Sequence, residues 1–219
     1  MGQNIDLSAS DGHHLSAYIS HATDAPRGGI VVIQEIFGVT RHIRAVTDQY
    51  ASAGFTAIAP ALFDRVERNV DVPYTDGPRG YKYVQQLKNE KVMLDVQAAI
   101  NRLNAAGKVG VVGYCWGGTM AYLAAARLKV AAAVAYYGGG VDQYLAEKPR
   151  CPILFHFGEK DMHIPLSTVE KVKEAVPEGT LYTYPAGHGF NCTDRESYDP
   201  ASAKLALKRS VDFFHQHVG

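Results

Sequence analysis

The chain has 219 residues, with 22 Lys and Arg against 22 Asp and Glu, so its formal net charge is zero. This balance excludes the basic surface by which proteins bind nucleic acids or anionic membranes, and it favours a small-molecule partner. The three cysteines are widely spaced, which predicts free thiols, and residues 1–20 lack the pattern of a signal peptide or membrane span, so we expect a cytoplasmic protein.

Strands and helices are expected to alternate along most of the chain. Apolar runs predict strands at residues 5–7, 15–19, 29–34, 55–59, 108–112, 130–136, 152–157 and 180–184. Helical spacing predicts helices at residues 41–53, 81–106, 117–128, 166–176 and 201–217, and residues 62–79 are expected to be irregular. This order is typical of one α/β domain over residues 1–219, with helices on both faces of a mostly parallel sheet.

The most informative motif is Gly-Tyr-Cys-Trp-Gly at residues 113–117, which lies between a predicted strand and a predicted helix. A nucleophile on such a sharp turn needs neighbours without bulky side chains, and the two glycines meet this need. Cys115 alone would suggest a buried structural thiol, but its glycine frame favours a nucleophile. Because a free thiol is largely protonated at neutral pH, the chain must also supply a base.

Two later turns provide the other members of a catalytic triad. Asp161 follows the strand predicted at 152–157, and His188 follows the strand predicted at 180–184. Nucleophile, acid and histidine occur in the chain order of an α/β-hydrolase, and the carboxyl ends of parallel strands meet at one sheet edge. We expect His188 to accept the proton of the Cys115 thiol and Asp161 to orient the imidazole. The alternatives are a helix-capping Asp161 and a surface His188.

Acyl transfer also requires donors for the developing oxyanion. The backbone N–H of Trp116 is one predicted donor, and the N–H of Ile36, in the loop after the third strand, is the other. Glu35 lies next to Ile36 and directly follows an apolar strand, where a charge usually needs a partner. Its carboxylate would repel an oxyanion, which indicates a specific role for this residue.

With these motifs the chain resembles the dienelactone hydrolase family, the cysteine branch of the α/β-hydrolases. The matching segments are residues 34–38, 110–118, 136–138, 158–161 and 186–190. The resemblance implies a lone α/β-hydrolase domain without a cofactor, in which Cys115 opens an enol-lactone or ester through an acyl-thioenzyme. It also implies that Glu35 holds the resting thiol and helps to form the thiolate when substrate arrives.

Substrate recognition departs from the family pattern. Enzymes that open dienelactone hold its carboxylate with two arginines, and here Arg79 is the nearest match before the long helix. No arginine directly follows His188, and Arg195 is out of register. Phe37 and Tyr137 are further predicted substrate contacts, and the bulk of Trp116 favours a more apolar or aromatic substrate.

Other functions stay open at this point. A general carboxylesterase or thioesterase, or a small-molecule-binding protein without activity, would fit the same scaffold. No metal is expected: His188 and Cys192 are four residues apart, but Gly189 disfavours a helix there. We interpret His42 as a surface residue and Cys192 as inert. The sequence defines neither the oligomeric state nor whether the Cys115 thiol rests against Glu35 or His188.

Overall fold

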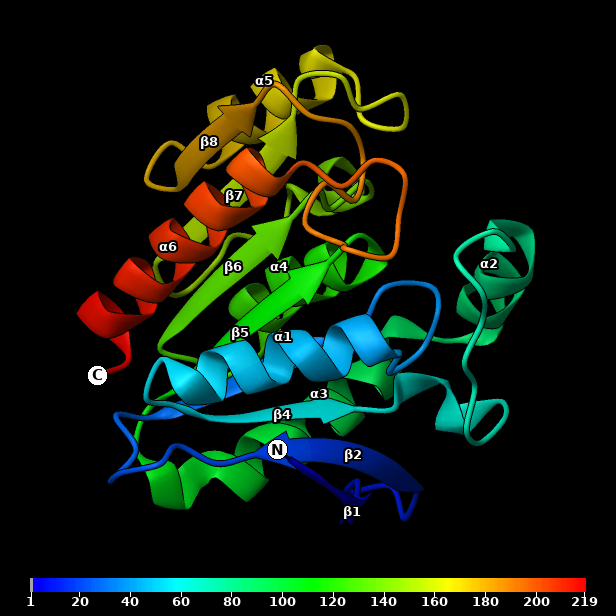
Figure 1. Ribbon diagram of the computed structural model, residues 1–219, viewed down its shortest axis with the longest axis vertical. Coiled ribbons are helices and arrows are strands. Elements are labelled where there is room, and N and C mark those ends of the chain that lie inside the picture. Colours follow the sequence, from blue (N-terminus) through cyan, green and yellow to red (C-terminus); the bar gives the residue numbers. More distant parts are fainter. Residues whose placement is uncertain (1) are drawn as a thin grey trace.

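Eight strands form a single sheet in the order β1-β2-β4-β3-β5-β6-β7-β8 (Figure 1). The computed structural model describes residues 2–219, so residue 1 of the predicted domain lies outside the described part. The strands are β1 (Gln3–Ser8), β2 (His14–Ser20), β3 (Gly29–Ile33), β4 (Thr56–Pro60), β5 (Val109–Tyr114), β6 (Ala132–Tyr136), β7 (Ile153–Gly158) and β8 (Thr180–Tyr184).

The sheet is antiparallel at one edge and parallel elsewhere. β1 pairs with β2 and β2 with β4 in antiparallel fashion, whereas the pairs from β4 through β3 to β8 are parallel. After β3 the chain moves outward to β4 and then returns past β3 to β5. The strand order therefore reverses between β3 and β5, and a crevice at the carboxyl ends of such a pair is where open α/β sheets bind ligands.

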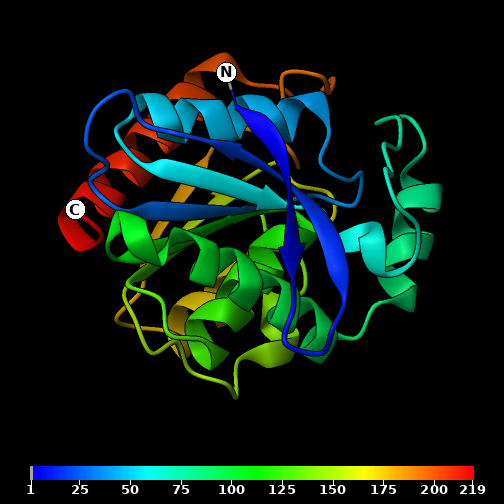
Figure 2. The same cartoon turned by 90° about the horizontal axis from the view of Figure 1, so that it is seen from below.

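Helices cover both faces of the sheet, as Figures 1 and 2 show. α1 (Arg41–Ser52) and α6 (Pro200–His217) lie on one face, and α3 (Asn89–Leu103), α4 (Trp116–Arg127) and α5 (Leu166–Ala175) lie on the other. Each of these five helices presents an apolar side to the sheet: Ile43, Val46 and Tyr50 of α1, for example, are buried in the core. The predicted α/β fold with a mostly parallel sheet is confirmed.

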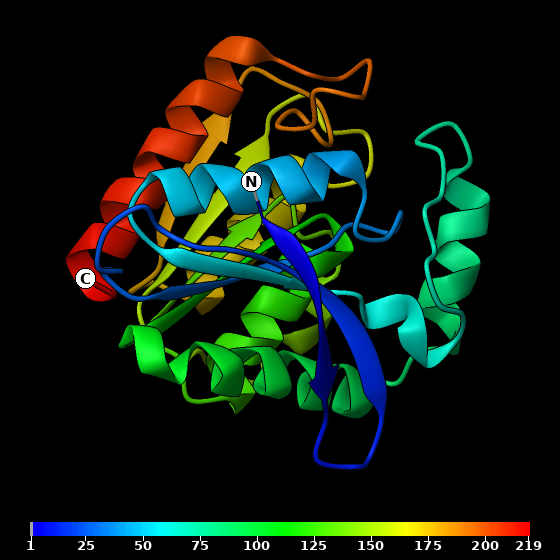
Figure 3. The ribbon, with the colours of Figure 1, turned by 60° about the horizontal axis from the view of Figure 1, so that its bottom comes forward.

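The prediction of one helix over residues 81–106 is wrong. The chain forms α2 (Gly77–Gln86) and then α3, with Leu87 and Lys88 in extended conformations between them. Tyr83 of α2 packs with Phe37 and Phe63 in a small separate cluster, whereas α3 packs on the sheet. One straight helix cannot meet both surfaces, and Figure 3 shows α2 standing apart from the sheet.

The segment predicted to be irregular also contains helical structure. A short 3₁₀ helix covers Leu62–Arg65, and the first turn of α2 falls within residues 62–79. The side chain of Asp76 caps α2 by accepting a hydrogen bond from the N–H of Arg79. Among the described residues, no helix is both long and apolar enough to cross a membrane.

Candidate active site

Cys115 lies at the bend between β5 and α4, with φ 55° and ψ −121°. A non-glycine residue adopts this conformation only when the surrounding structure holds it there. The neighbouring glycines are sterically required: a side chain at Gly113 would overlap the backbone of Gly117, and one at Gly117 would overlap the carbonyl groups of Ile33 and Gln34. The close approach of α4 to the end of β3 therefore depends on the glycine frame of the motif.

His188 and Asp161 reach Cys115 from the ends of two other strands. Nε2 of His188 lies 3.1 Å from Sγ of Cys115, and Nδ1 lies 2.7 Å from Oδ2 of Asp161. Asp161 follows β7, and His188 follows β8. The structure thus brings the three predicted residues together at one edge of the sheet and places the resting thiol against His188.

The hydrogen bonds of Asp161 define the orientation of the imidazole. Oδ1 accepts from the backbone N–H groups of His163 and Ile164, which leaves Oδ2 for His188. Because a carboxylate only accepts, Nδ1 of His188 carries the proton and Nε2 presents its lone pair to the thiol. The capping alternative for Asp161 is not supported, since no described side chain caps the start of α5.

The surroundings of Cys115 keep its thiol protonated at rest. Burial, together with the negative charge of Glu35, raises the pKa of Cys115 to about 12. The backbone N–H of Trp116, which hydrogen-bonds to the sulfur, and the positive charge of Arg195 act in the opposite direction. Proton transfer to His188 is therefore needed before Cys115 can react as a thiolate.

The two predicted oxyanion donors lie on the segments expected for them. Trp116 is the first residue of α4, and Ile36 lies in the loop after β3. Gly80 of α2 packs directly against the carbonyl of Ile36, where a side chain would overlap it. α2 therefore supports the loop that carries Ile36, although it stands away from the sheet.

Glu35 is fully buried, and no hydrogen bond to its carboxylate oxygens is made by a described residue. Nη1 of Arg195 lies 3.5 Å from Oε1 of Glu35, a separation typical of a weak ion pair. Burial raises the pKa of Glu35 to about 6, while Arg195 and Tyr74 counteract part of this effect. At neutral pH a largely ionised and poorly paired carboxylate thus lies beside Cys115.

The predicted substrate-binding residues differ in their exposure. Arg79 is exposed on the first turn of α2, whereas Phe37 is buried and its ring packs against that of Tyr74, with centroids 4.5 Å apart. Tyr137 is fully buried, and its ring centroid lies 5.2 Å from that of His188. The side chains of Phe37 and Tyr137 therefore shape the walls behind the site.

Sequence reasoning placed Arg195 outside the site, but its guanidinium group reaches Glu35 and lies 5.7 Å from the Phe37 ring centroid. The interpretation of His42 as a surface residue is wrong, because its side chain is buried. The sequence does contain a pattern that indicates burial of His42. It precedes Val46 and Tyr50 by about one and two helical turns, which places it on the apolar side of α1. Cys192 is buried beside the same carboxylate.

Residues 15–218 match the model of the dienelactone hydrolase family. Carboxymethylenebutenolidase of Pseudomonas putida is 34% identical over 224 residues, covering 96% of this chain and 95% of the relative. Carboxymethylenebutenolidase 1 of Cupriavidus pinatubonensis is 27% identical over 228 residues, covering 97% and 96%. Both relatives extend over nearly the whole chain.

Solved structures agree with these sequence matches. A dienelactone hydrolase candidate from Klebsiella pneumoniae superposes with a TM-score of 0.86 at 30% identity, covering 98% of this chain and all of the other. A dienelactone hydrolase-like promiscuous phosphotriesterase from metagenomic libraries gives a TM-score of 0.76 at 20% identity, covering 100% and 99%. The second match shows similarity of fold alone.

Proposed function

Because the chain belongs to the dienelactone hydrolase family, a family of hydrolases, we propose that it opens a small lactone or activated ester with Cys115 as nucleophile. The observation that carries this proposal is the continuous hydrogen-bonded chain from Cys115 through His188 to Asp161. This chain provides a nucleophile, a base and a group that orients the base. All three lie at the carboxyl ends of parallel strands.

Acylation begins when Sγ of Cys115 attacks the carbonyl carbon and Nε2 of His188 accepts the thiol proton. The carbonyl π electrons move to oxygen, and the N–H groups of Trp116 and Ile36 stabilise the resulting oxyanion. When the tetrahedral intermediate collapses, the carbon–oxygen bond to the leaving group breaks. His188 donates its proton to that oxygen, so the products are an acyl-thioenzyme and a hydroxyl or enol group.

Water completes the reaction by the same route. His188 accepts a proton from a water molecule whose oxygen attacks the thioester carbonyl, and the carbon–sulfur bond then breaks. The departing sulfur regains its proton from His188, and the carboxylic acid product leaves. Each cycle adds one water molecule to the ester and regenerates the thiol of Cys115.

A carboxylate on the substrate would find a positive charge at this site. Arg195 is the nearest cation to Glu35, and its side chain is one-fifth exposed, so solvent reaches it. We assign the substrate carboxylate to Arg195, with Arg79 at the α2 end of the site as a further contact. Phe37 and Tyr137, which are buried, would support the site from behind. The relatives named carboxymethylenebutenolidase agree with this substrate class.

The runner-up is a general carboxylesterase or thioesterase with the same mechanism, favoured by the aromatic Trp116 beside the nucleophile and by its packing against Phe63. The two substrate classes differ in their dependence on Arg195. Replacement of Arg195 by glutamine should raise the KM for a carboxylated enol-lactone and leave the KM for p-nitrophenyl acetate nearly unchanged. Equal effects on both substrates would favour the general esterase.

The nucleophile is tested with two cysteine variants. We expect Cys115→Ala to abolish hydrolysis of chromogenic esters and lactones while the circular dichroism spectrum stays unchanged. Cys151→Ala is the matched control, because Cys151 lies near the opposite ends of the strands, just before β7, and should retain full activity. Full activity in Cys115→Ala would refute the mechanism. Saturable binding of substrate without turnover by the unaltered protein would instead favour a non-catalytic binding protein.

A further inference from the structure

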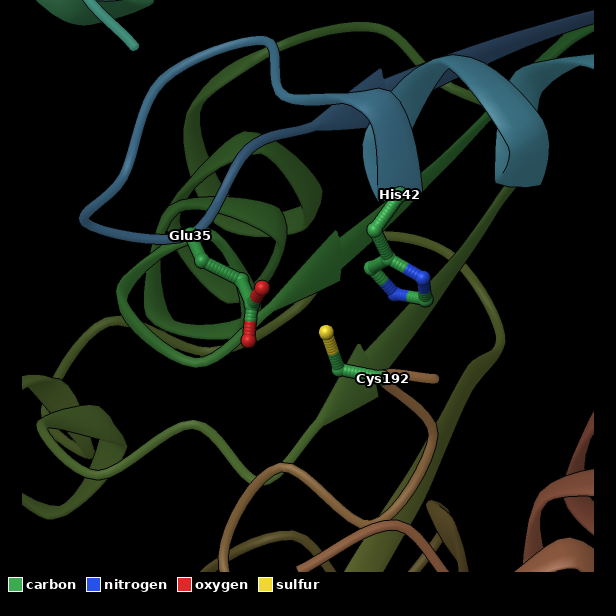
Figure 4. A group of neighbouring side chains, drawn as sticks. All are labelled: Glu35, His42 and Cys192. Carbon is green, nitrogen blue, oxygen red and sulfur yellow. The ribbon is translucent and has the colours of Figure 1, made fainter. Parts of the chain in front are cut away.

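Three side chains that bind metals in other proteins meet directly behind the nucleophile. Glu35 comes from the loop after β3, His42 from the first turn of α1, and Cys192 from the loop after β8. One potential ligand atom from each lies within 4.8 Å of the others. Figure 4 shows the carboxylate, imidazole and sulfur directed into the same space.

These groups are buried and poorly partnered: Glu35 has only a weak ion pair with Arg195 and the nearby Tyr74 hydroxyl. Glu35 and Cys192 are fully buried, and His42 is 4% exposed. Both carboxylate oxygens of Glu35 lack a hydrogen-bond partner among residues 2–219. The same is true of Nε2 of His42. A buried polar group without a hydrogen bond is energetically costly, so the imidazole of His42 and the weakly paired carboxylate of Glu35, which face each other across a thiol, indicate a ligand between them.

We propose that Glu35, His42 and Cys192 form a binding site for a divalent cation of the zinc class. One oxygen, one nitrogen and one sulfur ligand match the preference of zinc, whereas magnesium and calcium require oxygen ligands. On binding, the Cys192 thiol releases its proton to solvent and the thiolate contributes a lone pair to the metal. Glu35 and a neutral His42 contribute the other two lone pairs.

The observed separations fit such a site after small side-chain movements. Tetrahedral zinc with bonds of about 2.1 Å to oxygen or nitrogen and about 2.3 Å to sulfur separates its ligand atoms by about 3.6 Å. The three atoms therefore need to approach one another by about 1.2 Å at most. The Tyr74 hydroxyl lies beside both Glu35 and Cys192, so it or a water molecule is available as the fourth ligand.

Arg195 opposes metal binding through its positive charge. Its guanidinium group lies 3.5 Å from Glu35, and a cation at the carboxylate would have to replace it. The side chain is one-fifth exposed, so solvent is available for it to turn into. Removal of this charge should therefore strengthen metal binding, a result that a site elsewhere on the protein would not give.

Metal binding is measured most directly in a Cys115→Ala background, which removes the nucleophile as a competing thiolate ligand. We expect the variant to bind one Cd²⁺ per chain in equilibrium dialysis. The bound ion should give a thiolate-to-cadmium charge-transfer band in the ultraviolet, and added Zn²⁺ should displace it. Arg195→Gln in the same background should bind Cd²⁺ several-fold more tightly.

Two further cysteine replacements locate the thiolate. Adding Cys192→Ala should abolish the charge-transfer band, whereas adding the matched Cys151→Ala should leave it unchanged. Adding His42→Gln should keep the thiol but weaken binding at least tenfold. Retention of the band without Cys192, or equal affinity without His42, would overturn the proposal, and circular dichroism excludes unfolding as the cause of lost binding.

The effect of the metal on activity rests on the proposed function. Zinc at this site would take the carboxylate beside Cys115 and displace Arg195, so we expect it to inhibit hydrolysis by the unaltered protein. Cys192→Ala should remain active and become insensitive to zinc at the same concentration. Cadmium binding tests the metal site, and ester hydrolysis tests the proposed function. Because the two are measured separately, either proposal can fail while the other holds.

Discussion

Sγ of Cys115 lies 3.1 Å from Nε2 of His188, while burial raises the pKa of the same thiol to about 12. The thiol is thus held protonated against the imidazole. Charge separation between sulfur and imidazole is costly in this buried position until an electrophile accepts the electrons of sulfur.

Replacement of Asp161 by asparagine should reduce kcat/KM for ester hydrolysis by about 10³–10⁴-fold. The amide can donate a hydrogen bond to His188, which favours the tautomer whose Nε2 carries a proton and cannot accept one from the thiol. Asp142→Asn, in the 3₁₀ turn after β6, is the matched control and should retain activity. A loss of less than tenfold in Asp161→Asn would contradict the orienting role.

Glu35→Gln should accelerate alkylation of Cys115 by iodoacetamide at pH 8. The charge of Glu35 raises the pKa of the thiol, so its removal increases the thiolate fraction. The rate is measured from the modified Cys115 peptide by mass spectrometry, with the exposed Glu159→Gln as control. Slower alkylation in Glu35→Gln would indicate instead that Glu35 acts as a base toward the resting thiol.

The same substitution should change how stability depends on pH. Burial raises the pKa of Glu35 from 4.5 to about 6, so the folded protein holds this proton more tightly than the unfolded chain does. The associated stability is fully present below pH 4.5 and is lost as pH rises through 6, a loss of about 2 kcal/mol. As pH rises from 4.5 to 7.5, the free energy of unfolding of Glu35→Gln should therefore increase by about 2 kcal/mol relative to that of the unaltered protein.

Urea denaturation of both proteins at several pH values measures this difference, with a chelator present to remove bound metal. Glu159→Gln again serves as the control, because its carboxylate is exposed. A constant difference between Glu35→Gln and the unaltered protein over this pH range would show that Glu35 does not titrate as described.

Gly117→Ala should destabilise the protein by about 3 kcal/mol or more, because its methyl group would overlap the carbonyls of Ile33 and Gln34. Gly77→Ala in the first turn of α2 is the matched control. No described atom lies within 4 Å of the added methyl group, so it should be neutral or stabilise by up to about 1 kcal/mol. Thermal unfolding of both variants checks the pair, and similar melting temperatures would contradict the steric argument.

Local sequence patterns were sufficient for most of the sheet and for the order of its helices. Apolar runs such as residues 109–112 predict buried strands because the parallel sheet is covered on both faces. The break at Leu87 and Lys88 was missed because helical spacing continues through it. Only the separate packing surfaces of α2 and α3 require the chain to bend there.

The sequence by itself determined the sharp turn at Cys115, because the glycines beside it meet a steric demand within a few residues of chain. It also indicated which strand ends carry Asp161 and His188, since parallel strands bring their carboxyl ends to one edge. Only the tertiary structure decided what surrounds Glu35. Arg195 and Cys192 come to its carboxylate from the loop after β8, which is distant in sequence, and His42 comes from the first turn of α1. Such contacts depend on loop paths and side-chain packing, which no short sequence pattern encodes.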